Sequence, residues 1–222
     1  MLEVFVSAIL LLKINFAVFA MIFLFCLFRS FNLNIILVGF TYLLPLVPWW
    51  LGSAQVERIL IVSYCNLIFG IVEIVFFTLT ERQEDVKFNK AYLQQLFGHV
   101  LPIIAALIGM SFVSRTTLIP VDIWELIIIA ILFTFGTALR ILAISQLGFL
   151  RFKFNIAFRD KQTLKTDQLH KYMRHPTYTG MMIVILAYAV TTHSWYAGII
   201  GTFFAFFGFQ YRIHFEEKAL KE

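Results

Sequence analysis

The stretch Tyr172-Met-Arg-His-Pro-Thr-Tyr-Thr-Gly180 opens an apolar hairpin that ends at Arg212-Ile-His-Phe-Glu-Glu217. Arg212 and Glu216 are four residues apart, so a helix carries both on the same face. The hairpin returns this face to the segment where the hairpin began. Polar and ionisable groups are costly inside a bilayer, and clusters of them at the edge of apolar spans indicate a function. We therefore predict that the two polar clusters converge on one site.

The composition predicts an all-α, polytopic membrane protein. The chain has 222 residues, of which 60% are hydrophobic and 14% are charged, and its mean hydropathy is +0.85. A soluble domain of this size cannot bury so much apolar surface. The net charge of +5 is explained by basic residues beside apolar spans, which set membrane orientation and attract anionic lipids. We expect membrane lipids, and no nucleic acid, as partners.

Apolar segments predict a bundle of about seven transmembrane helices. They are Val4–Phe28, Leu33–Leu51, Ile59–Thr80, Leu96–Val113, Ile123–Leu147, Thr177–Val190 and Trp195–Tyr211. Pro45 and Pro48 should kink the second of these helices. We divide the chain into residues 1–147, with about five transmembrane helices, and residues 148–222, with a long loop and a C-terminal helical hairpin.

Charge predicts how the chain is oriented in the membrane. The loop Gly148–Arg174 contains seven basic residues against two acidic ones, the strongest basic excess in the chain, so we expect it to be cytoplasmic. Alternation of the spans then places Glu81–Gln95 and the C-terminus on the same side. Aromatic and aliphatic residues among the charges of the loop favour a folded cap at the membrane surface. Both a bacterial inner membrane and the endoplasmic reticulum fit this pattern.

Pro176 is suited to the first position of a helix, where its missing N–H is not needed. The backbone N–H groups that follow, near His175, Thr177 and Tyr178, could bind a carboxylate or another anionic group. The alternative is that this segment has no ligand: the helix start is capped within the protein, and His175 and Tyr178 are anchors at the membrane interface. The five histidines show no metal-ligand spacing, and we expect no metal.

Two charged residues lie well inside predicted spans. Glu73 and Arg140 are each seven residues from the cytoplasmic end of helices that run in the same direction, which places both at a depth of roughly 10 Å. We hypothesise that they form a buried ion pair. The alternative is that Arg140 extends toward the membrane surface and Glu73 faces a wet cavity.

Four pieces of sequence in the C-terminal third together resemble the isoprenylcysteine carboxyl methyltransferase family. They are Leu147-Gly148, Thr163-Leu164, the run Arg-His-Pro-Thr-Tyr-Thr-Gly180, and Arg212-x-x-x-Glu-Glu217. The resemblance covers roughly Gln146 to Lys221. It implies an integral membrane O-methyltransferase whose cofactor, S-adenosylmethionine, lies in a cytoplasmic pocket formed by the long loop and the ends of the last two helices.

The resemblance also implies roles for individual residues. Those expected to line the cofactor pocket are Gln162, Thr163, Leu164, Lys165, His170, His175, Pro176, Thr177 and Tyr178, with Asn155 as a weaker candidate. Glu216 would contact the cofactor and Arg212 would bind the acceptor, so both are the expected catalytic residues. The chain departs from the family at Gln168-Leu-His170, where Gly-x-Tyr is usual, and at Gln162, where the family often has histidine.

The acceptor implied by the family is lipid-like or prenylated, and a carboxylate such as that of isoprenylcysteine is the expected form. An NADPH-dependent reductase of the sterol or steroid type is an alternative, because such enzymes share an Arg-His-x-x-Tyr-x-Gly element. They commonly have Asn before the Tyr and an acidic residue after the Gly. Here those positions are Thr177 and Met181, which favours the methyltransferase. A non-enzymatic scaffold or lipid-binding membrane protein is the third alternative.

Overall fold

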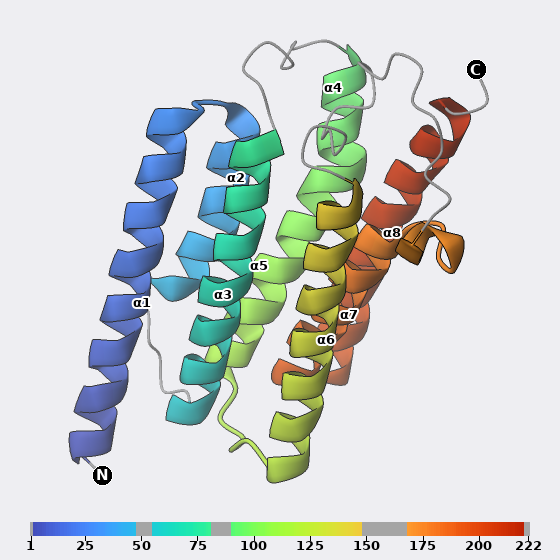
Figure 1. Ribbon diagram of the computed structural model, residues 1–222. Helices are drawn as coiled ribbons and strands as arrows, with labels where there is room; N and C mark the ends of the chain where they lie inside the picture. Colours follow the sequence, from blue (N-terminus) through green and yellow to red (C-terminus); the bar gives the residue numbers. More distant parts are fainter. Residues whose placement is uncertain (1, 48–54, 81–89, 148–167, 220–222) are drawn as a thin grey trace.

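The computed structural model describes residues 2–47, 55–80, 90–147 and 168–219, and these form an all-α bundle without strands (Figure 1). The helices are α1 (Leu2–Arg29), α2 (Leu33–Leu43), α3 (Val56–Thr80), α4 (Lys90–Gln95), α5 (Leu101–Thr116), α6 (Ile123–Leu147), α7 (Pro176–Thr191) and α8 (Trp195–Ala219). A π-helical turn, Leu96–Val100, joins α4 to α5 in one continuous rod. The predicted helical membrane bundle is confirmed.

Four helical stretches are long and apolar enough to cross a bilayer. They are Ala8–Arg29, Val56–Leu79, Tyr92–Thr116 and Ile123–Gln146. The apolar helical stretches Leu33–Leu46 and Pro176–Thr191 are shorter. Each of the seven predicted spans overlaps a helix of the described residues, and the chain is a multi-pass membrane protein. The site described below lies at the end of the bundle where α6 stops and α7 starts, which is uppermost in Figure 1.

The second span is interrupted as its prolines predict. Helix α2 starts at the cap Asn32, whose Oδ1 accepts a hydrogen bond from the Ile35 N–H at 2.8 Å, and gives way to a 3₁₀ turn that contains Pro45. Carbonyl groups left unpaired by such an interruption need other partners in an apolar bundle. Arg115 of α5 supplies them, because it donates to the carbonyl of Pro45 at 2.5 Å and to that of Val47 at 2.9 Å. Pro48 lies outside the described residues.

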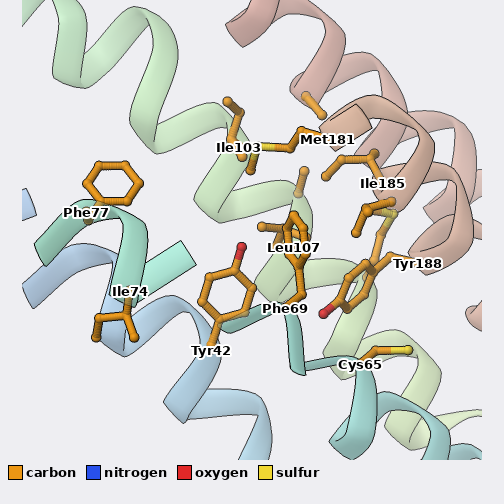
Figure 2. Packing of buried hydrophobic residues seen from close by; sticks show 14 of the residues in the cluster. Tyr42, Cys65, Phe69, Ile74, Phe77, Ile103, Leu107, Met181, Ile185 and Tyr188 are labelled. Atoms are coloured by element: carbon orange, nitrogen blue, oxygen red, sulfur yellow. The ribbon is translucent and has the colours of Figure 1, made fainter. Parts of the chain in front are cut away.

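One hydrophobic core joins helices from both sides of the predicted division after residue 147. Figure 2 shows Tyr42 of α2, Phe69 of α3, Leu107 of α5 and Ile185 of α7 packed together. All four are almost fully buried. The division of the chain into an N-terminal and a C-terminal part stays a prediction.

A buried arginine connects three helices at the end of the bundle where α3 and α6 begin and α7 ends. Arg58 of α3 donates to both carboxylate oxygens of Glu125 in α6, at 2.7 and 2.9 Å, and to the carbonyl of Thr191 at the end of α7, at 2.8 Å. Arg58 is only 1% exposed. Because removal of either partner would leave an unpaired buried charge, this pair holds the three helices together.

Two glycines bring the backbones of α6 and α7 into direct contact. A Cβ atom on Gly136 would lie 2.8 Å from the carbonyl oxygen of Gly180, and one on Gly180 would lie 2.7 Å from the backbone nitrogen of Arg140. Small residues allow this kind of close approach in membrane bundles. The contact places Arg140 beside the first turn of α7, where it donates to the carbonyl of Thr177 at 3.2 Å.

We predict that Gly180→Ala destabilises the fold by about 1–3 kcal/mol, because the added methyl group meets backbone atoms that cannot move aside. Gly109→Ala on α5 is the matched control, because no atom lies within 4 Å of the position of its added Cβ. Thermal unfolding in detergent, followed by circular dichroism, compares the two variants. Equal melting temperatures would refute the close α6–α7 contact.

Candidate functional site

A hydrogen-bonded cluster forms where the first turn of α7 meets the end of α8. The Tyr178 hydroxyl donates to Oε1 of Glu216 at 2.6 Å. Nε of Arg212 donates to the same oxygen at 2.9 Å and to the Tyr178 oxygen at 3.2 Å. Arg212 is 3% and Glu216 is 7% exposed. The structure thus brings the two polar segments of the sequence together, as predicted from the hairpin.

A second, more exposed layer of polar contacts covers this cluster. The imidazole Nε2 of His175 lies 3.4 Å from Oε1 of Glu217, and its Nδ1 lies 3.9 Å from Oε2 of Glu216. Arg174 donates to Oε1 of Glu217 at 3.1 Å from a side chain that is 76% exposed. Exposed pairs of this kind contribute little to stability. The two neighbouring carboxylates of α8 therefore differ: one is held inside the bundle, and the other faces its surface.

The first turn of α7 has the local structure that its sequence predicts. His175 occupies the cap position in a non-helical conformation, its side chain makes no capping hydrogen bond, and Pro176 is the first helical residue. The backbone N–H groups at such a helix start favour an anionic group. The Tyr178 and His175 rings lie beside this start, with their centroids 5.9 Å apart.

A cavity of about 70 Å³ lies on the bundle side of the cluster. It has room for several water-sized groups. Its polar lining comes from five helices and the π-helical turn: Asn34, Thr41, Tyr42, Glu73, His99, Arg140, Tyr178 and Arg212. Apolar residues complete the wall, and Figure 2 shows the Tyr42 hydroxyl pointing toward two of them, Ile103 and Met181.

Glu73 and Arg140 form the hypothesised ion pair on the wall of this cavity. Nη2 of Arg140 donates to Oε2 of Glu73 at 2.7 Å, and its Nε donates to the other carboxylate oxygen. Both residues are buried, with exposures of 2% for Glu73 and 4% for Arg140. The two-point geometry is the strong form of an arginine–carboxylate contact. With the bond from Arg140 to Thr177, the pair ties α3, α6 and α7 to one another.

Residues 127–222 match the sequence profile of the isoprenylcysteine carboxyl methyltransferase (ICMT) family. The C-terminal part of this chain is therefore similar to that family. No curated protein and no solved structure gives a match. The ICMT match contains Arg140, Tyr178, Arg212 and Glu216, whereas α1 to α5 lie outside it. The match favours a membrane methyltransferase.

Several pocket residues implied by the ICMT resemblance lie outside the described residues: Gln162, Thr163, Leu164, Lys165 and Asn155. His170 is half-buried on the 3₁₀ turn Gln168–Lys171, which is tied to α6 because the Leu169 N–H donates to the Gln146 side chain at 3.2 Å. The roles of all these residues stay predictions. Among the described residues, no group of three or more potential metal ligands occurs, and the expectation about metals also stays a prediction.

The departure from the ICMT pattern at Gln168 has a clear structural setting. Gln168 has a φ of 54°, the left-handed conformation that glycine adopts readily and other residues rarely do. The glycine usual in the family at this position would adopt this conformation at a lower cost than Gln168 does.

Sequence reasoning missed the cavity residues contributed by the N-terminal helices. Tyr42 and His99 lie in the predicted spans Leu33–Leu51 and Leu96–Val113, and both line the cavity. A signal was present for His99, because an ionisable residue within a span is a functional candidate in its own right. Nothing in the sequence indicated that Tyr42 faces the same space.

For the buried pair we predict that Glu73→Leu and Arg140→Met each destabilise the protein more than the double substitution does. Each single change leaves an uncompensated charge in the bundle, at a cost of about 3–5 kcal/mol. Melting temperatures of the three variants in detergent measure this, with the exposed Arg174→Met as the control. A double variant at least as unstable as each single variant would show that the two charges do not depend on each other.

Proposed function

We propose that this protein transfers a methyl group from S-adenosylmethionine to a lipophilic or prenylated acceptor. The expected acceptor group is a carboxylate such as that of isoprenylcysteine, which makes the reaction an O-methylation. The observation that carries the proposal is the Tyr178–Arg212–Glu216 cluster. It is buried and hydrogen-bonded, it borders a cavity, and it lies within the part of the chain that matches the family.

The residues around the cluster fit the groups of the proposed cofactor. Glu216 and Glu217 offer acceptors to ammonium and hydroxyl groups, and the start of α7 offers N–H donors to a carboxylate. The faces of His175 and Tyr178 suit a flat or cationic group. Pro176 and Thr177 would complete this wall. When bound, S-adenosylmethionine supplies an electrophilic methyl group.

Arg212 is suited to hold the acceptor. Its guanidinium borders the cavity, and Glu216 and Tyr178 fix its position. Methyl transfer needs the attacking oxygen in line and about 3–3.5 Å from the carbon. Arg212 would orient an acceptor carboxylate rather than lower the barrier, because its attraction for the oxygen weakens as the negative charge disappears. The planar guanidinium of an arginine can donate two parallel hydrogen bonds to a carboxylate.

We place the site on the cytoplasmic side of a bacterial inner membrane or of the endoplasmic reticulum. The basic residues of the loop before α7 support this orientation. The end of α8 and the start of α7 lie at the same end of the bundle (Figure 1). A lipophilic acceptor would then reach the cavity from the surrounding lipid.

Calorimetry of the detergent-purified protein with S-adenosylhomocysteine and, separately, with NADPH tests the choice of cofactor. We expect the first to bind and the second not to bind. Binding of NADPH alone would favour a reductase of the sterol or steroid type. Binding of neither would favour a scaffold or lipid-binding protein.

The roles of the two α8 residues are tested with Glu216→Gln and Arg212→Gln. We expect Glu216→Gln to weaken S-adenosylhomocysteine binding by about tenfold or more, the value of a hydrogen bond to a charged group. Arg212→Gln should reduce turnover of N-acetyl-S-farnesylcysteine more than it reduces cofactor affinity. Lys218→Gln, exposed on the same helix, is the control. The reverse pattern would mean that the two roles are exchanged.

A further inference from the structure

The side chain of Tyr42 on α2 is held in one position on the wall of the cavity, outside the part of the chain that matches the ICMT family. It is only 2% exposed. Its ring packs edge-on against the rings of Phe19 and Phe69, with centroids 6.4 and 6.0 Å away. Gly70 leaves room for it, because a Cβ atom at that position would lie 2.7 Å from Cβ of Tyr42. These contacts with α1 and α3 fix the direction of the Tyr42 hydroxyl.

The Tyr42 hydroxyl points into this cavity without a partner from the protein. Figure 2 shows it directed toward Ile103 and Met181, which also line the cavity. It forms no hydrogen bond with any residue that the structure describes. An unpaired polar group in the interior of a membrane bundle costs free energy, and a phenylalanine would fill nearly the same volume without that cost. The hydroxyl therefore needs a partner that enters the cavity.

The charges on the cavity wall favour an anionic partner. Glu73 and Arg140 are paired with each other, and Arg212 adds a positive charge. Glu216, which pairs with Arg212, does not belong to the described residues that line the cavity. The Tyr42 hydroxyl can donate to an anionic oxygen, and such a bond is stronger than one between neutral groups. Because the cavity is so small, a carboxylate bound to Arg212 within it lies within reach of Tyr42.

We propose that Tyr42 is an acceptor-binding residue that donates a hydrogen bond to the carboxylate oxygen that is not methylated. This inference rests on the proposed function and assigns to it a residue from the helices outside the family match. The other carboxylate oxygen forms a bond to the methyl carbon while the bond from that carbon to sulfur breaks, and an ester and S-adenosylhomocysteine result. Tyr42 keeps its proton throughout. By holding one oxygen, it leaves the second in position to attack.

The proposed hydrogen bond distinguishes the acceptor from its methylated product. It is strongest before the reaction, because the carboxylate is an anion and the ester is neutral. Tyr42 should therefore contribute to a preference of the protein for the free acid over its methyl ester. A residue that only supports the fold would change the affinity for both molecules to the same extent. The ratio of the two dissociation constants thus separates a contact with the acceptor from a structural role.

Tyr42→Phe removes the hydroxyl and keeps the ring. The dissociation constants of N-acetyl-S-farnesylcysteine and of its methyl ester are measured by calorimetry in the presence of saturating S-adenosylhomocysteine. We expect the substitution to weaken binding of the acid by about tenfold and binding of the ester by about threefold or less, so that the preference for the acid falls by about threefold or more. The affinity for S-adenosylhomocysteine itself should not change.

Tyr188→Phe on α7 is the matched control. Tyr188 is 1% exposed, and its hydroxyl also lacks a hydrogen-bond partner in the described part of the chain, but this residue is not among those that line the cavity. We expect Tyr188→Phe to keep the preference for the acid. Because neither hydroxyl is bonded within the fold, both variants should melt at or above the melting temperature of the unmodified protein.

The outcomes separate this inference from the proposed function. The role of Tyr42 is refuted, and the cofactor assignment stands, if S-adenosylhomocysteine binds but the unmodified protein binds neither probe or does not prefer the acid. The same conclusion follows if Tyr42→Phe reduces the preference no more than Tyr188→Phe does. It also follows if Tyr42→Phe melts at a lower temperature, because the hydroxyl would then be bonded within the fold. Failure of S-adenosylhomocysteine to bind refutes the proposed function and this inference with it.

Discussion

An ionised side chain in the interior of an apolar bundle needs a partner, and this constraint organises the structure. Three buried arginines are each bonded to a buried carboxylate. The pairs are Arg58 with Glu125, Arg140 with Glu73, and Arg212 with Glu216. The first two pairs connect α3 to α6, and removing one partner would leave an unpaired charge buried between these helices. The third lies within one turn of α8, so it is not needed to hold helices together. Arg212 of this pair also donates to the hydroxyl oxygen of Tyr178 in α7.

The residues around the cavity come from two parts of the chain. The helices that match the methyltransferase family provide the cluster at the start of α7 and the end of α8. The helices outside that match provide the other wall of the cavity, through Tyr42, Glu73 and His99. Arg140 links the two parts, because it donates both to Glu73 of α3 and to the carbonyl of Thr177 in α7.

The features that the sequence predicted well depend on simple, local rules. The i, i+4 spacing placed Arg212 beside Glu216, the equal depth of Glu73 and Arg140 predicted their pairing, and Pro45 predicted the interruption of the second span. The inward-facing sides of the helices could not be predicted in this way, because spans that are apolar on every face carry no clear amphipathic pattern. That is why Tyr42 was missed, whereas His99, as an ionisable residue within a span, carried a signal of its own. The contact of His99 with Gly208 joins residues 109 positions apart, and such pairing is a property of the packed bundle.

We propose that the pair on α8 serves the methyl-transfer site, with Glu216 contacting the cofactor, whereas the pairs between helices serve the fold. The most direct test is the affinity for S-adenosylhomocysteine of two variants in which one pair is replaced by apolar residues of similar size. Neither variant leaves an isolated charge behind, so both should remain folded. We expect Arg58→Met with Glu125→Leu to bind as the unmodified protein does, and Arg212→Met with Glu216→Leu to lose binding. Undiminished affinity in the second variant would contradict the account.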